Sequence, residues 1–113
     1  MSALAPDEVV HQSMRLRILA TLHALPHGGP LEFVELKALL AATDGNLGTH
    51  LATLEKAGYV TSAKDFVGRK PRTQLTLTPG GRRAFDDHVA YLRSVIAGAA
   101  AGQSPGDTPG ARP

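Results

Sequence analysis

The sequence contains no cysteine and no tryptophan, and only 4% of its residues are aromatic. Without thiols the chain can form no disulfide scaffold, thiolate zinc site or iron–sulfur cluster. It also lacks an apolar run near the roughly 18 residues that cross a bilayer. Its acidic start around Pro6-Asp7-Glu8 is unlike the basic flank of a signal peptide. We therefore expect a soluble, cytoplasmic protein with no membrane partner.

Catalytic and metal-binding patterns are equally scarce. The sequence has no glycine-rich phosphate loop and no recognisable nucleophile turn, and its adjacent carboxylates are limited to Asp86-Asp87. Asp86 and His88 would begin a metal site on one helix, but no second histidine or carboxylate follows within that helix, and a site needs three or four ligands. We expect neither an enzyme nor a metal or cofactor site.

Length and charge narrow the class further. The 113 residues, 42% of them hydrophobic, suffice for one domain with a single core. The formal net charge is only +2, but residues 64–83 carry six lysines and arginines against Asp65 alone. Such a local basic excess indicates where a polyanion would sit.

Apolar spacing predicts three helices in the first half of the chain. The first spans residues 6–25 and ends at the proline- and glycine-rich segment 26–30. A strand of one or two residues at Leu31-Glu32 precedes a short helix at 33–41. The third helix spans 44–57, with Thr43 as its N-cap and Gly58 at its left-handed end. Two short helices joined by about three residues are typical of a helix-turn-helix.

The second half predicts a hairpin and one long helix. Residues 59–67 and 73–78 are β-prone, and the basic turn 68–72 between them supplies glycine and proline. Thr78 and Pro79 cap and open a helix whose apolar residues recur at coiled-coil spacing. We place the folded domain at 6–99 and a disordered tail at 100–113, where large apolar residues are absent.

Four motifs follow one another in these segments: Thr43-Asp44-Gly45-Asn46-Leu47, Leu54-Glu55-Lys56-Ala57-Gly58-Tyr59-Val60, Gly68-Arg69-Lys70-Pro71-Arg72-Thr73 and Leu77-Thr78-Pro79-Gly80-Gly81-Arg82. With them the chain resembles the winged helix DNA-binding domain family, in its short form related to MarR and ArsR regulators. The resemblance covers roughly residues 9–97 and implies an α+β, mainly α fold: a three-helix core with a helix-turn-helix, a two-stranded β-hairpin wing and a C-terminal dimerisation helix. It also implies a homodimer that binds duplex DNA and regulates transcription, with repression the expected sign.

In this architecture the helix at 44–57 enters the major groove and the wing at 68–72 lies on the backbone or in the minor groove. Asn46 and Thr49 suit base edges, whereas the wing cations suit phosphates. Arg15, Arg17, Arg82 and Arg83 could extend the backbone track. The expected DNA-binding residues are Asp44, Gly45, Asn46, Thr49, His50, Thr53, Arg69, Lys70 and Arg72.

A dimer would bury the second apolar face of the last helix. A small-molecule effector bound between the core and the dimer helices stays open, since no residue set identifies one. The helix at 44–57 is poor in cations, so a winged helix that contacts proteins without binding DNA is the alternative function. The expected dimer interface consists of Val9, Val10, Leu16, Tyr91, Leu92, Val95 and Ile96.

Overall fold

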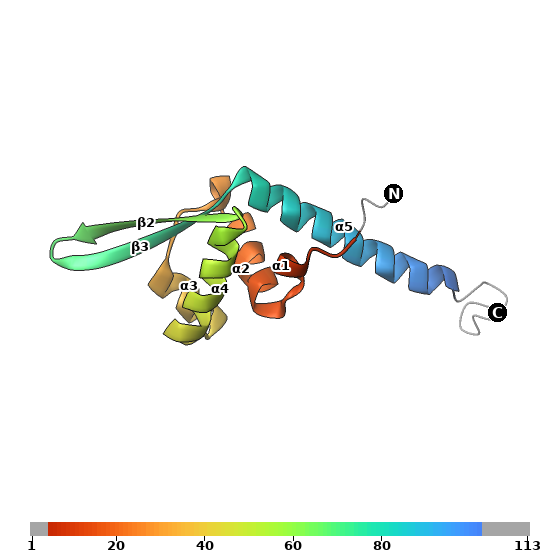
Figure 1. Cartoon of the computed structure of the whole chain (residues 1–113), viewed down its shortest axis with the longest axis horizontal. Coiled ribbons are helices and arrows are strands. Elements are labelled where there is room, and N and C mark those ends of the chain that lie inside the picture. The colour runs from red at the N-terminus through yellow and green to blue at the C-terminus, as the bar shows by residue number, and fades with distance from the viewer. Residues whose placement is uncertain (1–4, 103–113) are drawn as a thin grey trace.

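The computed structural model describes residues 5–102, and side chains up to residue 99. Helices form the body, a β-hairpin projects from one side of it, and the long last helix projects from the other (Figure 1). This is the winged helix expected from the sequence. In chain order the elements are α1 (Glu8–His11), α2 (Ser13–His23), a 3-10 turn (Pro26–Gly28), β1 (Leu31–Glu32), α3 (Phe33–Leu40), α4 (Asp44–Lys56), β2 (Val60–Val67), β3 (Lys70–Leu77) and α5 (Pro79–Gly102).

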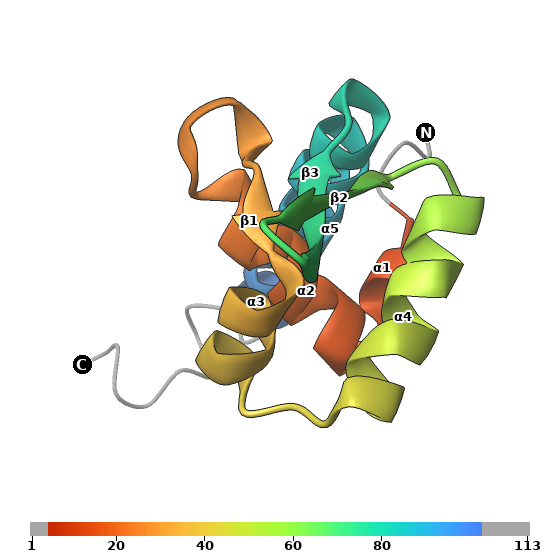
Figure 2. The same cartoon turned by 90° about the vertical axis from the view of Figure 1, so that its left-hand side faces the viewer.

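The core lies where α2, α3 and α4 meet the sheet. Figure 2 shows α3 and α4 joined by a short loop, with α2 packed between them. Each of these three helices buries leucine side chains. Leucine-to-alanine changes at such sites typically cost about 2–5 kcal/mol. The buried apolar residues are Val10, Ile18, Leu19, Leu22, Leu36, Leu40, Leu47, Leu51, Leu54, Val60, Leu75 and Leu77.

The single helix predicted over 6–25 is wrong, because the structure divides it at Gln12. Gln12 is extended, with φ −69° and ψ 133°, and its side chain accepts a hydrogen bond from the Arg15 amide to cap α2. Asp7 caps α1 in the same way, accepting from the amides of Val9 and Val10. The break turns α1 so that Val10 is fully buried in the chain's own core. Burial of that side chain offsets the helical hydrogen bonds lost at the break.

The helix-turn-helix is confirmed nearly to the residue. The Thr43 side chain accepts a hydrogen bond from the Asn46 amide at 3.1 Å, so threonine is the N-cap of α4 as predicted. Gly58 has φ +82°, the left-handed conformation that glycine adopts without a steric penalty. Helices α3 and α4 each end one residue before the predicted boundary. Both ends of α4 are therefore set by residues adjacent to them in the sequence, Thr43 at the start and Gly58 after the end.

The hairpin pairs over its full length. The sheet order is β1-β3-β2, with Val60 opposite Leu77 and Val67 opposite Lys70. The predicted turn over 68–72 is too long, because the chain reverses at Gly68 and Arg69 alone. Gly68 has φ +64° and makes the tight reversal. Residues 70–72 therefore belong to strand β3, which leaves a shorter cationic tip.

Helix α5 begins as predicted, since the Gly81 amide donates to the Thr78 hydroxyl at 2.9 Å. It continues to Gly102, three residues into the predicted tail, and residues 103–113 lie outside the described part of the chain. On the side of α5 that faces the core, Phe85 packs against the buried apolar residues and His88 is buried, whereas Ile96 is 69% exposed. Within residues 5–102 no helix is both long and apolar enough to cross a membrane.

Candidate nucleic-acid interface

Helix α4 turns its apolar side inward and leaves a polar surface uncovered. Leu47, Leu51 and Leu54 are buried at the i, i+4, i+7 spacing of one helix face. Four of the predicted groove-facing residues, Asp44, Gly45, Asn46 and Thr49, are exposed, and His50 and Thr53 are partly exposed. An exposed helix of this width fits the major groove of B-form DNA.

The side chains on this surface differ in how free they are. The Asp44 carboxylate pairs with Lys37 Nζ on α3 at 2.6 Å, so its negative charge is compensated. The Thr53 hydroxyl donates to the Thr49 carbonyl at 3.3 Å, back along the helix. The backbone N–H of Asn46 bonds to Thr43, but its side-chain amide makes no hydrogen bond within residues 5–102. The side-chain amide therefore keeps its two donors and its acceptor for a ligand.

His50 lies at the margin of the α4 surface and contacts α2. Its Nδ1 lies 3.1 Å from Arg15 Nη1, and Arg15 Nε donates to the Val9 carbonyl at 2.6 Å. The sequence suggested that Arg15 could extend the track of backbone contacts on DNA, but it gave no sign of this pair. The two residues are 35 positions apart on different helices, so no local pattern could have connected them.

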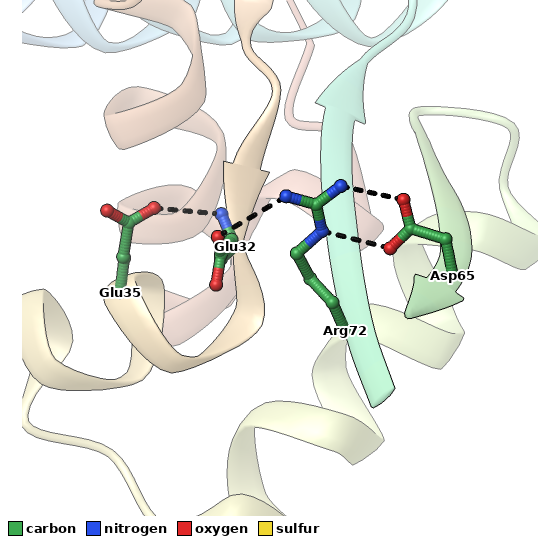
Figure 3. Close-up of polar contacts among 4 residues, drawn as sticks. All are labelled: Glu32, Glu35, Asp65 and Arg72. Carbon is green, nitrogen blue, oxygen red and sulfur yellow. Dashed lines mark hydrogen bonds and ion pairs between the residues drawn. The ribbon is translucent and has the colours of Figure 1, made fainter. Parts of the chain in front are cut away.

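The wing carries two kinds of cation. Arg69 and Lys70 at the tip are exposed, and neither forms an ion pair within the described residues. Arg72 is instead held between two acids (Figure 3). Its Nε and Nη2 donate to the Asp65 carboxylate at 2.9 and 2.7 Å, and its Nη1 lies 3.9 Å from Glu32 Oε2 on β1.

The Arg72 contacts have electrostatic and structural consequences. The hydrogen bonds from Arg72 hold the pKa of the Asp65 carboxyl below its ordinary value. Glu32 is also the N-cap of α3, and its amide donates to the Glu35 carboxylate at 3.1 Å (Figure 3). The expectation that Arg72 supplies a free charge to phosphate does not fit these contacts. Arg72 ties the wing to the start of α3, whereas Arg69 and Lys70 at the tip are not compensated by an acid within the described residues.

Apolar side chains near the wing tip were not foreseen. Phe66 is 69% and Val67 56% exposed on β2. Val67, Lys70 and Pro71 line one side of a groove of about 460 Å³, and Phe33 and Val34 of α3 line the other. Their β-propensity predicted the strand correctly, but exposure at a hairpin end depends on how far the hairpin projects from the body.

The expected dimer residues fall into two groups. Val10 is buried within the subunit and is therefore unavailable to a partner, which corrects that assignment. Val9 and Leu16 are partly buried and pack against the same core. On α5, Tyr91 and Leu92 are half-buried, whereas Val95 and Ile96 are 49% and 69% exposed. The exposed apolar residues thus concentrate on the projecting half of α5.

The junction between the N-terminal segment and α5 contains two histidines. His88 is 1% exposed, its Nε2 lies 3.4 Å from His11 Nδ1, and its Nδ1 is buried without a partner. Burial and the neighbouring His11 lower the pKa of His88. Nearby, the Tyr59 hydroxyl donates to the Asp7 carboxylate at 2.6 Å. No group of three metal-ligating side chains occurs within residues 5–102.

Comparison with known proteins identifies the family. Residues 14–96 match the family model described as "Winged helix DNA-binding domain". The chain belongs to this family. An uncharacterised protein of Methanocaldococcus jannaschii is 35% identical over 82 residues, which cover 73% of this chain and 86% of that protein.

Solved structures of transcriptional regulators share this fold. The structure of a transcriptional regulator homologue from Pyrococcus horikoshii superposes with a TM-score of 0.75 at 28% identity, over 82% of this chain and 89% of the other. A MarR-like transcriptional regulator from Thermotoga maritima superposes with a TM-score of 0.59 at 23% identity, over 94% of this chain and 74% of the other, and shares the fold. The described α4 and wing lie within the region that the family model matches.

Proposed function

We propose that this winged helix protein is a homodimeric, sequence-specific DNA-binding regulator of transcription that acts as a repressor in the cytoplasm. One observation carries the proposal: the polar surface of α4 is uncovered, and the wing beside it presents unpaired cations at its tip. The P. horikoshii structure, 28% identical to this chain, is described as that of a transcriptional regulator homologue. Repression needs only that the bound dimer occupy promoter DNA.

The side chains of α4 and of the wing suit different parts of the DNA. Asn46 can pair with adenine in the major groove through both ends of its amide, and Thr49 can meet a thymine methyl. Arg69 and Lys70 supply affinity through phosphates, or enter a minor groove whose narrow walls enhance the negative potential. Binding strength therefore resides mainly in the wing, and base preference resides in α4.

Dimerisation supports this function through α5. The projecting half of α5 exposes Val95 and Ile96, which a second copy of α5 would cover. A twofold dimer presents two α4 helices to two half-sites about one DNA turn apart. A Val95→Glu and Ile96→Glu double variant is expected to be monomeric in light scattering and to bind one half-site weakly. A double variant that remains dimeric would refute this placement of the interface.

The function is tested by titrating labelled duplexes with the full chain and following fluorescence anisotropy. Fragments of the source genome supply the binding site, and a shuffled duplex supplies the nonspecific reference. Asn46→Ala is expected to reduce the ratio between the two affinities by about fivefold to a hundredfold, the range for loss of one base contact. Arg93→Ala, on exposed α5, is the control variant and should leave the ratio unchanged. Failure to bind any duplex at low salt would refute the proposal and favour a protein-contact module.

A further inference from the structure

Arg15 is fixed in place at the point where α1, α2 and α4 meet. Its Nε donates to the Val9 carbonyl at 2.6 Å and its Nη2 to the Glu8 carbonyl at 3.5 Å. Both carbonyls belong to α1, which is four residues long and leaves its last carbonyls without helical partners. The guanidinium is therefore held against the backbone of α1, and its remaining nitrogen, Nη1, points to His50.

This contact determines which ring nitrogen of His50 carries the proton. A guanidinium has donors only, so the His50 Nδ1 that lies 3.1 Å from Arg15 Nη1 must accept. A neutral ring that accepts at Nδ1 carries its hydrogen on Nε2. His50 is partly exposed, and in the described part of the chain its Nε2 has no protein partner and is not among the buried unpaired atoms. Nε2 is therefore a donor that is free for a ligand.

The donor lies on the flank of α4 away from the wing. The wing-side flank is formed by Gly48, Leu51 and Glu55, which line a cavity with Ser62 and Lys64 of β2. Figure 1 shows the hairpin and α1 on opposite sides of α4. Each edge of a major groove is bounded by one phosphate backbone, so the wing tip serves one edge and leaves the other without an assigned contact.

We infer that His50 Nε2–H donates a hydrogen bond to a phosphate oxygen at the groove edge opposite the wing, and that Arg15 is the positioning residue that selects this tautomer. The inference rests on the proposed DNA-binding function. On the wing side a cation contacts the DNA backbone, whereas at the opposite edge a neutral histidine makes that contact through a hydrogen bond. The contact should add affinity without base preference and without counterion release.

The tautomer is tested first in the free protein, by long-range proton–nitrogen NMR of the histidine rings. The expected result is an Nε2–H ring for His50 in the wild type with no Nδ1–H form, and in Arg15→Met the mixture of both tautomers that free histidine shows. An Nδ1–H ring in the wild type would overturn the inference without any DNA experiment. Thermal unfolding of each variant checks that it is folded.

Binding is then compared on the selected and the shuffled duplex. His50→Met should weaken both complexes by about tenfold, the loss of one hydrogen bond, with an unchanged salt slope. His50→Gln, which keeps a donor, should recover most of the affinity, and Arg93→Ala on exposed α5 is again the control. Once Arg15 is replaced by Met, adding His50→Met should weaken binding by less than it does in the wild type, because part of the ring population then carries its hydrogen on Nδ1 or is turned away from the phosphate.

The outcomes separate this inference from the proposed function. Duplex binding by the wild type with unchanged affinity of His50→Met would overturn the inference alone. A loss confined to the selected duplex would also overturn it, because that pattern indicates a base contact. If the wild type binds no duplex, the proposed function and the inference fail together.

Discussion

Removing the two unpaired cations of the wing tip should change the salt dependence of DNA binding by a calculable amount. Each cation that neutralises a phosphate contributes a slope of about −0.9 to log K against log salt concentration. Arg69 and Lys70 have no ion-pair partner among the described residues, so both are counted in full. Replacing both with alanine should flatten the slope by about 1.8 per subunit and about 3.6 per dimer.

The paired cation provides the contrasting case within the same strand. Arg72 already holds the Asp65 carboxylate with two hydrogen bonds, so Arg72→Ala should flatten the slope by less than Arg69→Ala does. Asp65→Ala should act in the opposite direction. It frees the guanidinium for phosphate and should steepen the slope by up to about 0.9 per subunit.

The assay is an anisotropy titration of one duplex at salt concentrations from about 50 to 200 mM, the range over which phosphate contacts dominate affinity changes. Thermal unfolding confirms that each variant is folded. Equal slope changes for Arg72→Ala and Arg69→Ala would refute the division of the wing into paired and unpaired charges. An unchanged slope in the Arg69 and Lys70 double variant would refute the wing's role in binding.

Three further predictions concern stability. Gly48→Ala should raise the free energy of unfolding by about 0.5–1 kcal/mol, since the site is helical and open. Gly81→Ala should instead destabilise the fold strongly, because the Tyr59 carbonyl occupies the space of a new Cβ. Thermal unfolding compares the two variants, and equal effects would contradict this packing. The hydrogen bond to Asp7, with burial, raises the pKa of Tyr59 to about 12, so stability should fall as pH rises from 10 toward 12, and ultraviolet titration should show a late transition that Tyr59→Phe lacks. The lowered pKa of His88 means that the unfolded chain binds a proton that the folded chain resists, so stability should fall as pH drops through 6.5; a His88→Leu variant with the same acid-side loss in chemical denaturation would contradict this.

Local signals were sufficient to predict most elements. Thr43 as a cap, Gly58 as a left-handed terminator and Pro79 at the first turn of α5 each act through neighbouring backbone, so their effect is readable from a few residues. The short strand at Leu31-Glu32 was also predicted correctly, and it pairs with β3. These features fix the position of α4, and hence the polar surface of the candidate interface.

The errors arose where distant residues decide the outcome. Gln12 is an ordinary helix former, and it breaks the first helix because Val10 then reaches the core. Pro71 and Arg72 read as a turn, but Arg72 lies in a strand opposite Asp65, where cross-strand pairing compensates for the proline. A sequence window sees neither the burial of Val10 nor the charge pair across the hairpin.

The central claim is that α4 and the wing tip together form a surface that reads duplex DNA. The most direct test is selection of bound duplexes from a genomic fragment pool by the full chain, followed by a hydroxyl-radical footprint of the selected site. The account predicts two half-sites related by twofold symmetry, about one DNA turn apart, with backbone protection on both sides of each major-groove contact. Absence of any enriched duplex, or a footprint that is unchanged when Arg69 and Lys70 are both replaced with alanine, would contradict it.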